Sequence, residues 1–346
     1  MKTLKDFDFE NKRVLVRCDF NVPLDKRGNI LDDFRIKQVI PTISYLIEKK
    51  AKIILMSHLG DPGGKAAEGL RLDPVQGKLM EYLDFSITKA PDCIGQEAKE
   101  WVNNIQPGEI LLLENLRFHK EEEENNQNFA RELAESGEIY VNEAFSCSHR
   151  AHASIVGVPE FLPSAMGLIF EKEIDVLGRL LKNPQRPFVA IVGGKKVETK
   201  AKFLDKLCEI ADWVLTGGKI EVEIKEKRFR FSCPEKIINP VDDIDTFDIG
   251  PKTVEIFKEK IIRAKTVFWV GPLGMIENEK YVSGSKEIAK AIAESGSFSI
   301  VGGGDTVEFI NGLGIFDKFS YVSTGGGATL AFLSEGTLPG IEALNN

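Results

Sequence analysis

The strongest constraint on the fold is an alternation of short β-rich runs with longer stretches of helical spacing, present in both halves of the chain. In the first half, the expected strands are residues 13–18, 52–56, 109–113 and 139–142, and the expected helices are residues 35–49, 76–83 and 128–135. Strands that alternate with helices in this way build a parallel sheet with helices on its faces.

The second half repeats this alternation. Its expected strands are residues 187–192, 213–216, 266–270, 298–301 and 321–324, and its helices include residues 253–262 and 285–294. The chain has 346 residues, about twice the length of one ordinary α/β domain. We therefore expect an α/β fold of two Rossmann-like, three-layer α/β/α domains with parallel sheets, joined by an interdomain helix at residues 171–181 and a hinge.

Charge and composition exclude several classes of protein. Lys and Arg total 45 against 53 Asp and Glu, which argues against a partner such as nucleic acid or a membrane surface. The five cysteines are scattered without a C-x-x-C pair, as is typical of reduced thiols in the cytosol. The N-terminal residues lack the apolar core of a secretory signal, and no apolar run has the length of a membrane helix. We expect a cytoplasmic protein.

Glycine follows five expected strands of the second half. In an open parallel sheet such turns share one edge, where ligands bind, and glycine lets the backbone come close to a phosphate. A single glycine turn would be explained by a tight connection alone, but five on one edge favour a phosphate site. The turns are Gly193-Gly194, Gly217-Gly218, the segment from Gly271 to Gly274, Gly302 to Gly304, and Gly325 to Gly327.

Four polar residues near these turns suit a magnesium–polyphosphate ligand. Asp305 and Thr306 open an expected helix, where they offer a carboxylate and a hydroxyl, although an aspartate there is also a common helix N-cap. Lys196 and Lys200 are four residues apart and can share one helix face, although such a pair is often a solvated surface. Neither the Walker A nor the dinucleotide fingerprint is present, which disfavours a Walker ATPase or a dehydrogenase.

In the first half, cations follow successive expected strands. Singly, each arginine could form a surface ion pair and each histidine could be structural, but their recurrence at strand ends favours a site for a small, multiply charged anion. The residues are Asp19 and Asn21 after the first strand, Arg35 at a helix start, His58, Arg117, and Arg150 with His152.

Seven segments carry a family resemblance in order along the chain: residues 17–23 (RCDFNVP), 57–60 (SHLG), 113–118 (LENLRF), 149–154 (HRAHAS), 248–251 (DIGP), 301–306 (VGGGDT) and 323–328 (STGGGA). From end to end, the sequence resembles the phosphoglycerate kinase family. The resemblance implies reversible phosphoryl transfer between ATP and 3-phosphoglycerate, giving ADP and 1,3-bisphosphoglycerate, with Mg²⁺ as cofactor of ATP or ADP. It also implies a glycolytic enzyme that is a monomer.

The resemblance assigns the binding residues to two sets. The residues implied for 3-phosphoglycerate are Asp19, Phe20, Asn21, Arg35, His58, Leu59, Gly60, Arg117 and Arg150. Those implied for the nucleotide are Gly194, Lys196, Lys200, Gly217, Gly218, Pro272, Gly274, Glu277, Gly303, Gly304, Asp305 and Thr306, with Glu277 on the ribose and Asp305 on Mg²⁺. Catalysis is expected from charge stabilisation by Arg35, Lys200, Gly325, Gly326 and Gly327, because the acceptor carboxylate needs no general base.

The resemblance also implies a division of labour between domains. Residues 1–165 would bind 3-phosphoglycerate and residues 187–330 would bind the nucleotide. Residues 166–186 would form the interdomain helix and hinge, and residues 331–346 would return to the N-terminal domain. Closure at the hinge would bring the ligands together for direct in-line transfer and exclude water.

The sequence departs from the family pattern in the second domain and at several single positions. The chain is shorter after Gly218 and before Asp248 than the family is. Asp61 stands where the family has arginine, which puts an anion beside the expected substrate phosphate. Further changes are Glu143 for Asp, Ser146 for Gly, Lys195 for a small residue and Val270 for Asn. We expect activity to survive with altered affinity.

Two other functions remain possible from the sequence alone. A non-catalytic paralogue could keep the fold and bind a nucleotide or phosphometabolite as a regulator, and the shortened domain and Asp61 favour this alternative. A nicotinamide-dependent oxidoreductase would share the Rossmann-like halves, but the absent dinucleotide fingerprint opposes it.

Overall fold

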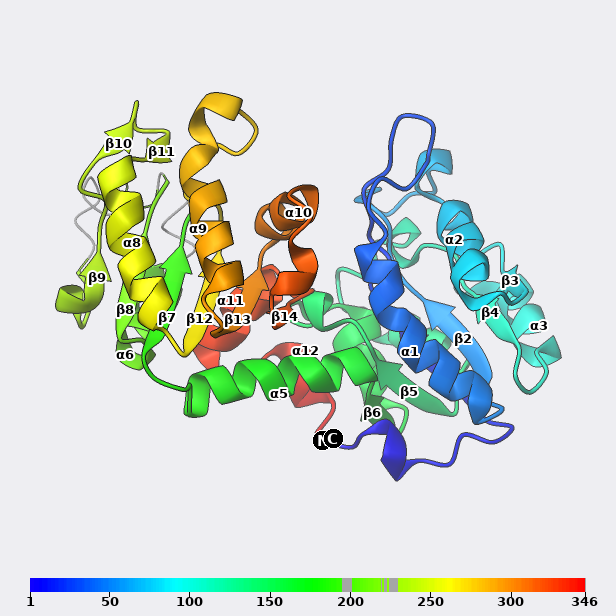
Figure 1. The fold of residues 1–346 in the computed structure, drawn as a ribbon. Helices are drawn as coiled ribbons and strands as arrows, with labels where there is room; N and C mark the ends of the chain where they lie inside the picture. Colours follow the sequence, from blue (N-terminus) through cyan, green and yellow to red (C-terminus); the bar gives the residue numbers. More distant parts are fainter. Residues whose placement is uncertain (195–200, 219, 221–222, 224–229, 346) are drawn as a thin grey trace. The chain divides into compact units, whose positions relative to one another are not determined.

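The computed structural model describes residues 1–194, 201–218, 220, 223 and 230–345. The chain divides into two compact units (Figure 1). Unit 1 consists of Met1–Ile174 with Thr337–Asn346, and unit 2 consists of Asp175–Gly336. The helix α5 (Leu168–Lys182) begins in unit 1 and ends in unit 2, so a continuous helix joins them.

Unit 1 is built on a six-stranded parallel sheet with the order β3-β4-β2-β1-β5-β6. The central strands are almost fully buried apolar runs, as expected for a parallel sheet covered on both faces. The strands are β1 (Arg13–Arg17), β2 (Lys52–Met56), β3 (Ile87–Lys89), β4 (Ile110–Leu112), β5 (Ile139–Asn142) and β6 (Ser164–Met166).

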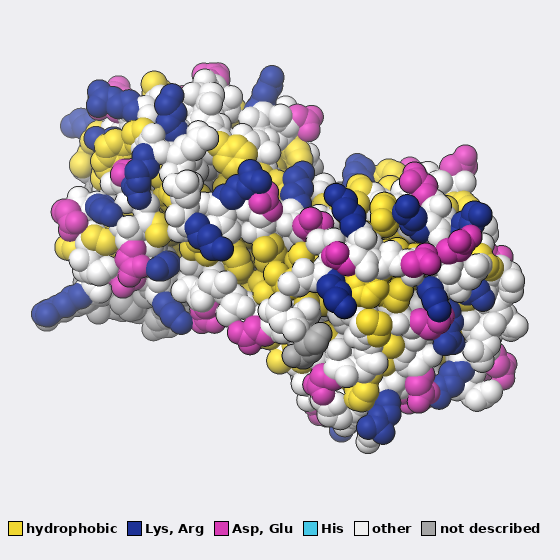
Figure 2. Space-filling model, turned by 90° about the horizontal axis from the view of Figure 1, so that it is seen from below, with side chains coloured by type: hydrophobic (Ala, Val, Ile, Leu, Met, Phe, Trp, Pro, Cys, Tyr) yellow, Lys and Arg dark blue, Asp and Glu magenta, His cyan; other side chains and the backbone are white. Residues whose placement is uncertain are grey.

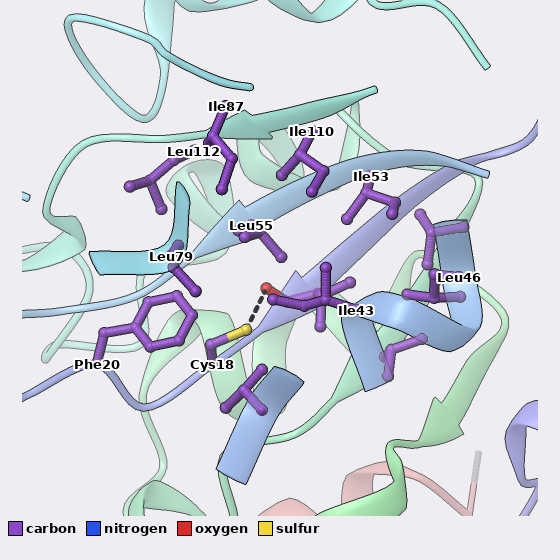
Figure 3. Packing of buried hydrophobic residues seen from close by; sticks show 14 of the residues in the cluster. Cys18, Phe20, Ile43, Leu46, Ile53, Leu55, Leu79, Ile87, Ile110 and Leu112 are labelled. Carbon is purple, nitrogen blue, oxygen red and sulfur yellow. Dashed lines mark hydrogen bonds between the residues drawn. The ribbon is translucent and has the colours of Figure 1, made fainter. Parts of the chain in front are cut away.

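Helices cover both faces of this sheet. Alternate strand residues such as Ile53 and Leu55 pack with Ile43 of α1 and Leu79 of α2, and the Cys18 thiol donates to the carbonyl of Val16 at 3.7 Å (Figure 3). Tyr140 points to the opposite face, where its hydroxyl donates to the carbonyl of Ser154 at 2.8 Å. The helices of unit 1 are α1 (Phe34–Glu48), α2 (Asp73–Leu83), α3 (Gly95–Asn104), α4 (Gln127–Ala134) and α12 (Pro339–Ala343).

Unit 2 contains a second six-stranded parallel sheet, with the order β14-β13-β12-β7-β8-β9, and a small antiparallel pair, β10-β11. The strands β7 and β12 are buried throughout, and every residue of β12 pairs with one of β7. The strands are β7 (Phe188–Val192), β8 (Trp213–Thr216), β9 (Ile237–Ile238), β10 (Asp243–Ile244), β11 (Asp248–Ile249), β12 (Thr266–Val270), β13 (Phe298–Gly302) and β14 (Tyr321–Val322).

Unit 2 is also layered. Figure 1 shows α8 and α9 side by side along one face of the sheet, and α6 and α11 pack together on the other. The rings of Phe203 in α6 and Phe268 in β12 meet edge to face, with centroids 6.0 Å apart. The helices are α6 (Ala201–Ile210), α8 (Pro251–Arg263), α9 (Ser283–Glu294), α10 (Gly304–Gly312) and α11 (Gly327–Glu335). The predicted α/β fold with two parallel sheets is therefore confirmed.

Two further observations concern the surface and the helices. On the face drawn in Figure 2, acidic and basic side chains are interspersed, in keeping with the near balance of the two kinds in the sequence. None of the described helices combines the length and the apolarity that crossing a lipid bilayer requires.

Candidate functional site

The sheet of unit 1 places three loops at one edge. Arg17, the last residue of β1, pairs with Met56 of β2 on one side and with Asn142 of β5 on the other. The segments that follow these strands therefore start beside one another, and they contain Asp19, His58 and Ser146 in turn. The expected anion site is assembled from these loops.

Asp19 and Arg35 form the first ion pair of this site. The Arg35 Nη1 donates to Asp19 Oδ2 at 2.8 Å and to the carbonyl of Asn21 at 3.1 Å, and the hydroxyl of Ser146 also donates to Asp19. Burial alone would raise the pKa of Asp19, but the charge of Arg35 and the hydrogen bonds from Ser146 and the Asn21 N–H lower it to about 2. Asp19 is therefore a carboxylate at neutral pH, and it holds the Arg35 guanidinium in place.

His58 is a neutral hydrogen-bond donor in this arrangement. Burial, then the charge of Arg17, lowers the pKa of His58 well below its usual range. The Arg17 Nη2 lies 3.3 Å from His58 Nδ1, and a guanidinium can only donate, so Nδ1 accepts. The proton of the imidazole consequently sits on Nε2, where it is available to an anion.

Arg117 and Arg150 bring further positive charge to the same region. The Arg117 Nη1 donates to the carbonyl of Gly60 at 2.8 Å, while its buried Nε–H has no hydrogen-bond acceptor among the described residues, although Glu123 Oε1 is 3.3 Å away. Arg150 is exposed. Burial and then the charges of Arg17, Arg117 and Arg150 lower the pKa of His152 to about 4, which places these arginines around one imidazole.

The remaining predicted residues of unit 1 form hydrogen bonds between backbone N–H groups and side-chain oxygens. The Asn21 Oδ1 accepts the Gly60 N–H at 2.8 Å, and the Phe20 N–H donates to Ser57 Oγ at 2.8 Å. The Leu59 N–H donates to Asn115 Oδ1 at 3.3 Å. These bonds lock the loops after β1 and β2 together. The structure thus brings Asp19, Asn21, Arg35, His58, Gly60 and Arg117 into one network, which we call the cationic cluster together with Arg17 and Arg150.

Sequence reasoning gave no role to Arg17, the buried centre of this cluster. Arg17 is 1% exposed, and its Nε donates to Ser154 Oγ at 2.7 Å. Its Nη2 lies 3.9 Å from Glu122 Oε1, which is also fully buried. The signal that could have found it is a charged residue at the end of a buried apolar strand, because a buried charge needs a partner.

In unit 2, the strand-end glycines line one cavity of about 330 Å³. Val192 of β7 pairs with Thr216, and it also pairs with Val270, which in turn pairs with Gly302, so the turns after these strands lie along one edge. The lining residues are Gly194, Gly218, Thr246, Phe247, Val270, Gly271, Pro272, Gly274, Met275, Glu277, Gly303, Gly304, Asp305, Thr306, Gly326, Gly327 and Leu330.

The floor of this cavity is made of closely approaching backbone. Gly271 has a φ of +79°, and a Cβ there would overlap the carbonyl oxygen of Gly193. The Gly193 N–H donates to the carbonyl of Val270, and the Gly194 N–H donates to that of Pro272. Only glycine can bring these two turns together, so the glycines here serve both the tight connection and the close approach of backbone to a ligand.

Two helix N-termini open into the cavity. α10 and α11 begin after Gly303 and Gly326, and neither has a side-chain cap for its first N–H groups. Such free N–H groups and the helix dipole suit phosphate oxygens. Asp305 is exposed in the first turn of α10, and its carboxylate has no hydrogen bond to another described residue, so it can take an oxygen-seeking cation such as Mg²⁺.

Thr306 has a structural contact as well as a place in the lining. Its hydroxyl is buried and accepts the Gly271 N–H at 2.8 Å, which ties the start of α10 to the turn after β12. The hydroxyl proton remains available as a donor. The predicted Asp305 N-cap alternative is not what the structure has, because the N-cap position of α10 is Gly303.

Apolar and polar residues that sequence reasoning missed complete the cavity. Thr246 and Phe247 come from the turn before β11, Met275 from the turn after β12 and Leu330 from α11. Phe247 also meets the ring of Tyr281 at 5.1 Å. An apolar wall beside phosphate-binding groups is what a nucleobase requires. Sequence reasoning missed this wall because the chain is shorter than the family pattern just before Asp248.

Asp248 ties β11 to the start of α9. It accepts the Gly284 N–H at the start of α9 at 2.8 Å and the Ile249 N–H at 2.9 Å. Burial raises the pKa of Asp248 to about 6, against the effect of these two hydrogen bonds. The carboxylate is thus a partly desolvated anchor behind the cavity.

Two predicted residues are not in the cavity lining, and two others lie outside the part of the chain that the structure describes. Gly217 is buried beside the cavity and does not line it, and a Cβ there would press on Leu273. Gly325 is also buried, and its N–H donates to Ser323 Oγ at 3.1 Å. Lys196 and Lys200 fall outside the described residues, as does Lys195.

Comparison with known proteins supports one family. A family model described as phosphoglycerate kinase matches residues 4–229 and 221–336. The chain is 43% identical over 389 residues to a curated protein named phosphoglycerate kinase from Dictyoglomus turgidum, with 99% of this chain and 98% of the relative covered. It is also 43% identical over 394 residues to one from Chlorobaculum tepidum, with 100% and 99% covered. Both alignments are longer than the 346 residues of this chain, so these relatives carry segments that this chain lacks.

Solved structures agree with the sequence matches. Phosphoglycerate kinase from Pyrococcus horikoshii OT3 has a TM-score of 0.89 at 32% identity, with 100% of this chain and 98% of that chain covered. The enzyme from Coxiella burnetii has a TM-score of 0.85 at 34% identity, with 99% and 98% covered. These matches support neither a non-catalytic binding protein nor a nicotinamide-dependent oxidoreductase. The chain belongs to the phosphoglycerate kinase family and is a phosphotransferase.

Proposed function

We propose that the chain transfers a phosphoryl group reversibly between Mg·ATP and 3-phosphoglycerate, with the acceptor on unit 1 and the nucleotide on unit 2. The observation that carries this proposal is the presence of two different anion sites, each at the edge of a parallel sheet where strands end. The cationic cluster suits a small anion, and the glycine-lined cavity suits a polyphosphate with a base. A monomeric, cytoplasmic, glycolytic enzyme is part of the same proposal.

On unit 1, the cationic cluster would hold both charged ends of 3-phosphoglycerate. Arg117 has a buried Nε–H with no described acceptor, and His58 presents Nε2–H as a neutral donor. Arg35 is one-third exposed while Asp19 fixes its other side, so it can reach a ligand without losing its position. Arg35 would neutralise charge on the phosphoryl group during transfer.

On unit 2, backbone groups would hold the phosphates. The first N–H groups of α10 and α11 face the cavity, and Glu277 lies in the same lining near the expected ribose. Asp305 is the carboxylate that would hold Mg²⁺, which neutralises charge on the phosphate oxygens when bound. Thr246, Phe247, Met275 and Leu330 would contact the base.

The reaction needs little covalent chemistry from the protein. The acceptor carboxylate is already a nucleophile, so no general base is required and no phosphoenzyme forms. Catalysis then rests on positioning and on charge stabilisation by Arg35 and the amides of Gly326 and Gly327, with Lys200 expected to contribute. Because the acceptor and nucleotide sites belong to different units, transfer requires that the two bound ligands be brought together and that water be kept out.

A coupled spectrophotometric assay tests this proposal. Purified protein with Mg·ATP and 3-phosphoglycerate should produce ADP, and Arg35→Ala should lower kcat by about 10³-fold. Asp305→Ala should abolish ADP formation at millimolar Mg²⁺, because the bound nucleotide loses the carboxylate that holds its cation. Arg27→Ala is the matched control for Arg35, because Arg27 is exposed in a turn of the same unit.

Two results would overturn the proposal. One is ADP formation at the same rate with and without 3-phosphoglycerate, which would indicate an ATPase. The other is no turnover by a folded protein that binds Mg·ADP, which would indicate a binding protein. Equal loss in Arg27→Ala and Arg35→Ala would remove the assigned role of Arg35.

A further inference from the structure

Two thiols of unit 2 lie near each other, and neither belongs to the cavity lining. Cys208 is buried in α6, and Cys233 is half-buried immediately before the turn Pro234–Lys236. Both are free thiols, and they are close enough for Cys233 to raise the pKa of Cys208. The other three cysteines are buried in unit 1.

Hydrogen bonds on both sides of Cys233 hold it against α6. The N–H and the hydroxyl of Ser232 donate to Asp205 Oδ1 at 2.7 and 2.9 Å. Lys236 Nζ donates to the carbonyl of Cys208 at 2.8 Å. Asp205 and Cys208 are three residues apart on α6 and share one face, so the segment that carries Cys233 is pinned to that face before and after the thiol.

We propose that Cys208 and Cys233 form an oxidation site, at which hydrogen peroxide converts the two thiols into one intramolecular disulfide. Cys233 is the partly exposed member and reacts first: its sulfur bonds to one peroxide oxygen, the O–O bond breaks, and the second oxygen takes up the thiol proton and leaves as water. Cys208 then displaces the hydroxyl from the sulfenic sulfur, and its thiol proton leaves with that hydroxyl as a second water. The two sulfurs supply the two electrons that reduce the peroxide.

The chemistry of the pair supports this order. Burial, then the neighbouring Cys233, raises the pKa of Cys208 to about 12, so Cys208 is inert toward peroxide by itself. The cation of Lys236 acts in the opposite direction, and it stands beside Cys208 when the second step needs a thiolate. Cys208 is therefore suited to attack a sulfur that the flanking hydrogen bonds hold near it.

The disulfide would close a ring over residues 208–233. This ring contains β8 and Gly218, which lines the nucleotide cavity. A bond between residues so far apart in sequence restricts the unfolded chain, and it should raise the Tm of unit 2 by about 5 °C. Oxidation would thus strengthen the unit against unfolding.

Thiol counting and peptide mapping test the proposal. The native protein, treated with a small excess of hydrogen peroxide, should fall from five titratable thiols in denaturant to three, and a Cys208–Cys233 peptide should appear. Dithiothreitol should restore five thiols and return Tm to its starting value. Cys233→Ser should keep its four thiols under the same treatment and show no rise in Tm.

The matched comparison is the same protein oxidised in urea, where the pinned geometry is absent and the Cys208–Cys233 pair should lose its preference over other pairings. Preferential pairing in the native state alone supports the site. Oxidation of Cys233 to the sulfinic acid while Cys208 still titrates would overturn the proposal. Even loss over all five cysteines would also overturn it.

Discussion

The candidate anion sites of the two units are built from different chemical groups. The site of unit 1 is made of side chains, in which Asp19 orients Arg35 and Arg17 orients His58. The site of unit 2 is made mainly of backbone, in which glycine turns and helix N-termini face the cavity. The charged side chains of the described lining are Asp305 and Glu277. Charged side chains in fixed positions suit a compact anion on unit 1, whereas a row of backbone N–H groups suits an extended anion on unit 2.

The two solutions have different weaknesses. Side-chain recognition requires buried ionisable groups, such as Arg17 and Glu122, which are stable only while each keeps its partners. Backbone recognition requires conformations and close approaches that only glycine allows, as at Gly271. Unit 1 should therefore be sensitive to charge and pH, whereas unit 2 should be sensitive to added side-chain volume.

The largest expected effect comes from volume in unit 2. Gly271→Ala would place a Cβ against the Gly193 carbonyl at a φ of +79°, so the free energy of unfolding of unit 2 should fall by about 3 kcal/mol and ADP binding should weaken. Urea unfolding and ADP titration measure both. Gly312→Ala is the matched control, because nothing lies within 4 Å of its added Cβ, and it should change stability by less than about 1 kcal/mol. Similar losses in the two variants would refute the steric account.

A pH effect should follow in unit 1. Burial raises the pKa of Glu143 to about 7, even though Thr42 and the Ile169 N–H donate to it. Below pH 4.5, Glu143 is protonated whether the chain is folded or not, and its contribution to stability is complete. As pH rises toward and through 7, the unfolded chain ionises first and the contribution is lost, about 3 kcal/mol at most.

Glu143→Gln tests this direction. The variant carries no titratable group there, so its free energy of unfolding should fall less than that of the wild type between about pH 5 and pH 8. Urea unfolding at each pH provides the measurement, and the difference between the two proteins cancels the titration of other groups. Parallel pH profiles would show that Glu143 has an ordinary pKa.

The smallest effect concerns a surface charge near the cationic cluster. Asp61 is exposed and follows Gly60, whose carbonyl accepts from Arg117. Asp61→Arg exchanges an anion for a cation there and should lower KM for 3-phosphoglycerate by about three- to tenfold, less at high salt. Glu48→Arg makes the same charge change at the far end of α1 from Arg35 and should leave KM unchanged. An unchanged KM in Asp61→Arg would show that this anion does not act on the bound substrate.

The long, buried elements were predictable from the sequence. Residues 52–56, 139–142, 213–216 and 266–270 match β2, β5, β8 and β12 to the residue, because each is an apolar run bounded by polar or turn residues. The short strands β3, β6 and β9 were missed. They lie at or near the sheet edges, where two or three residues are too few to establish a period, and only pairing in the fold defines them.

The candidate site residues that could be predicted from the sequence are those whose residue type itself indicates their chemistry. Arg35, Arg117 and Asp305 stand out because a charged side chain at a helix start, after a strand or after a glycine turn lies at the edge of the sheet where ligands bind. The sequence could not predict which other side chains each of these residues contacts. Nothing in the sequence pairs Ser146 with Asp19 or Arg17 with His58, because these contacts join loops far apart in the chain. The apolar cavity residues likewise resemble any other core residue.

The position of α12 in the sequence determines when unit 1 can finish folding during synthesis. The helix α12 belongs to unit 1, and the Gly340 N–H donates to the carbonyl of Ser148 at 2.9 Å, where a side chain on Gly340 would collide with Ser148. All of unit 2 lies between these partners in sequence. During synthesis, the ribosome therefore releases the first 174 residues of unit 1 well before the segment that finishes it. Unit 1 is therefore complete only after all of unit 2 has been synthesised.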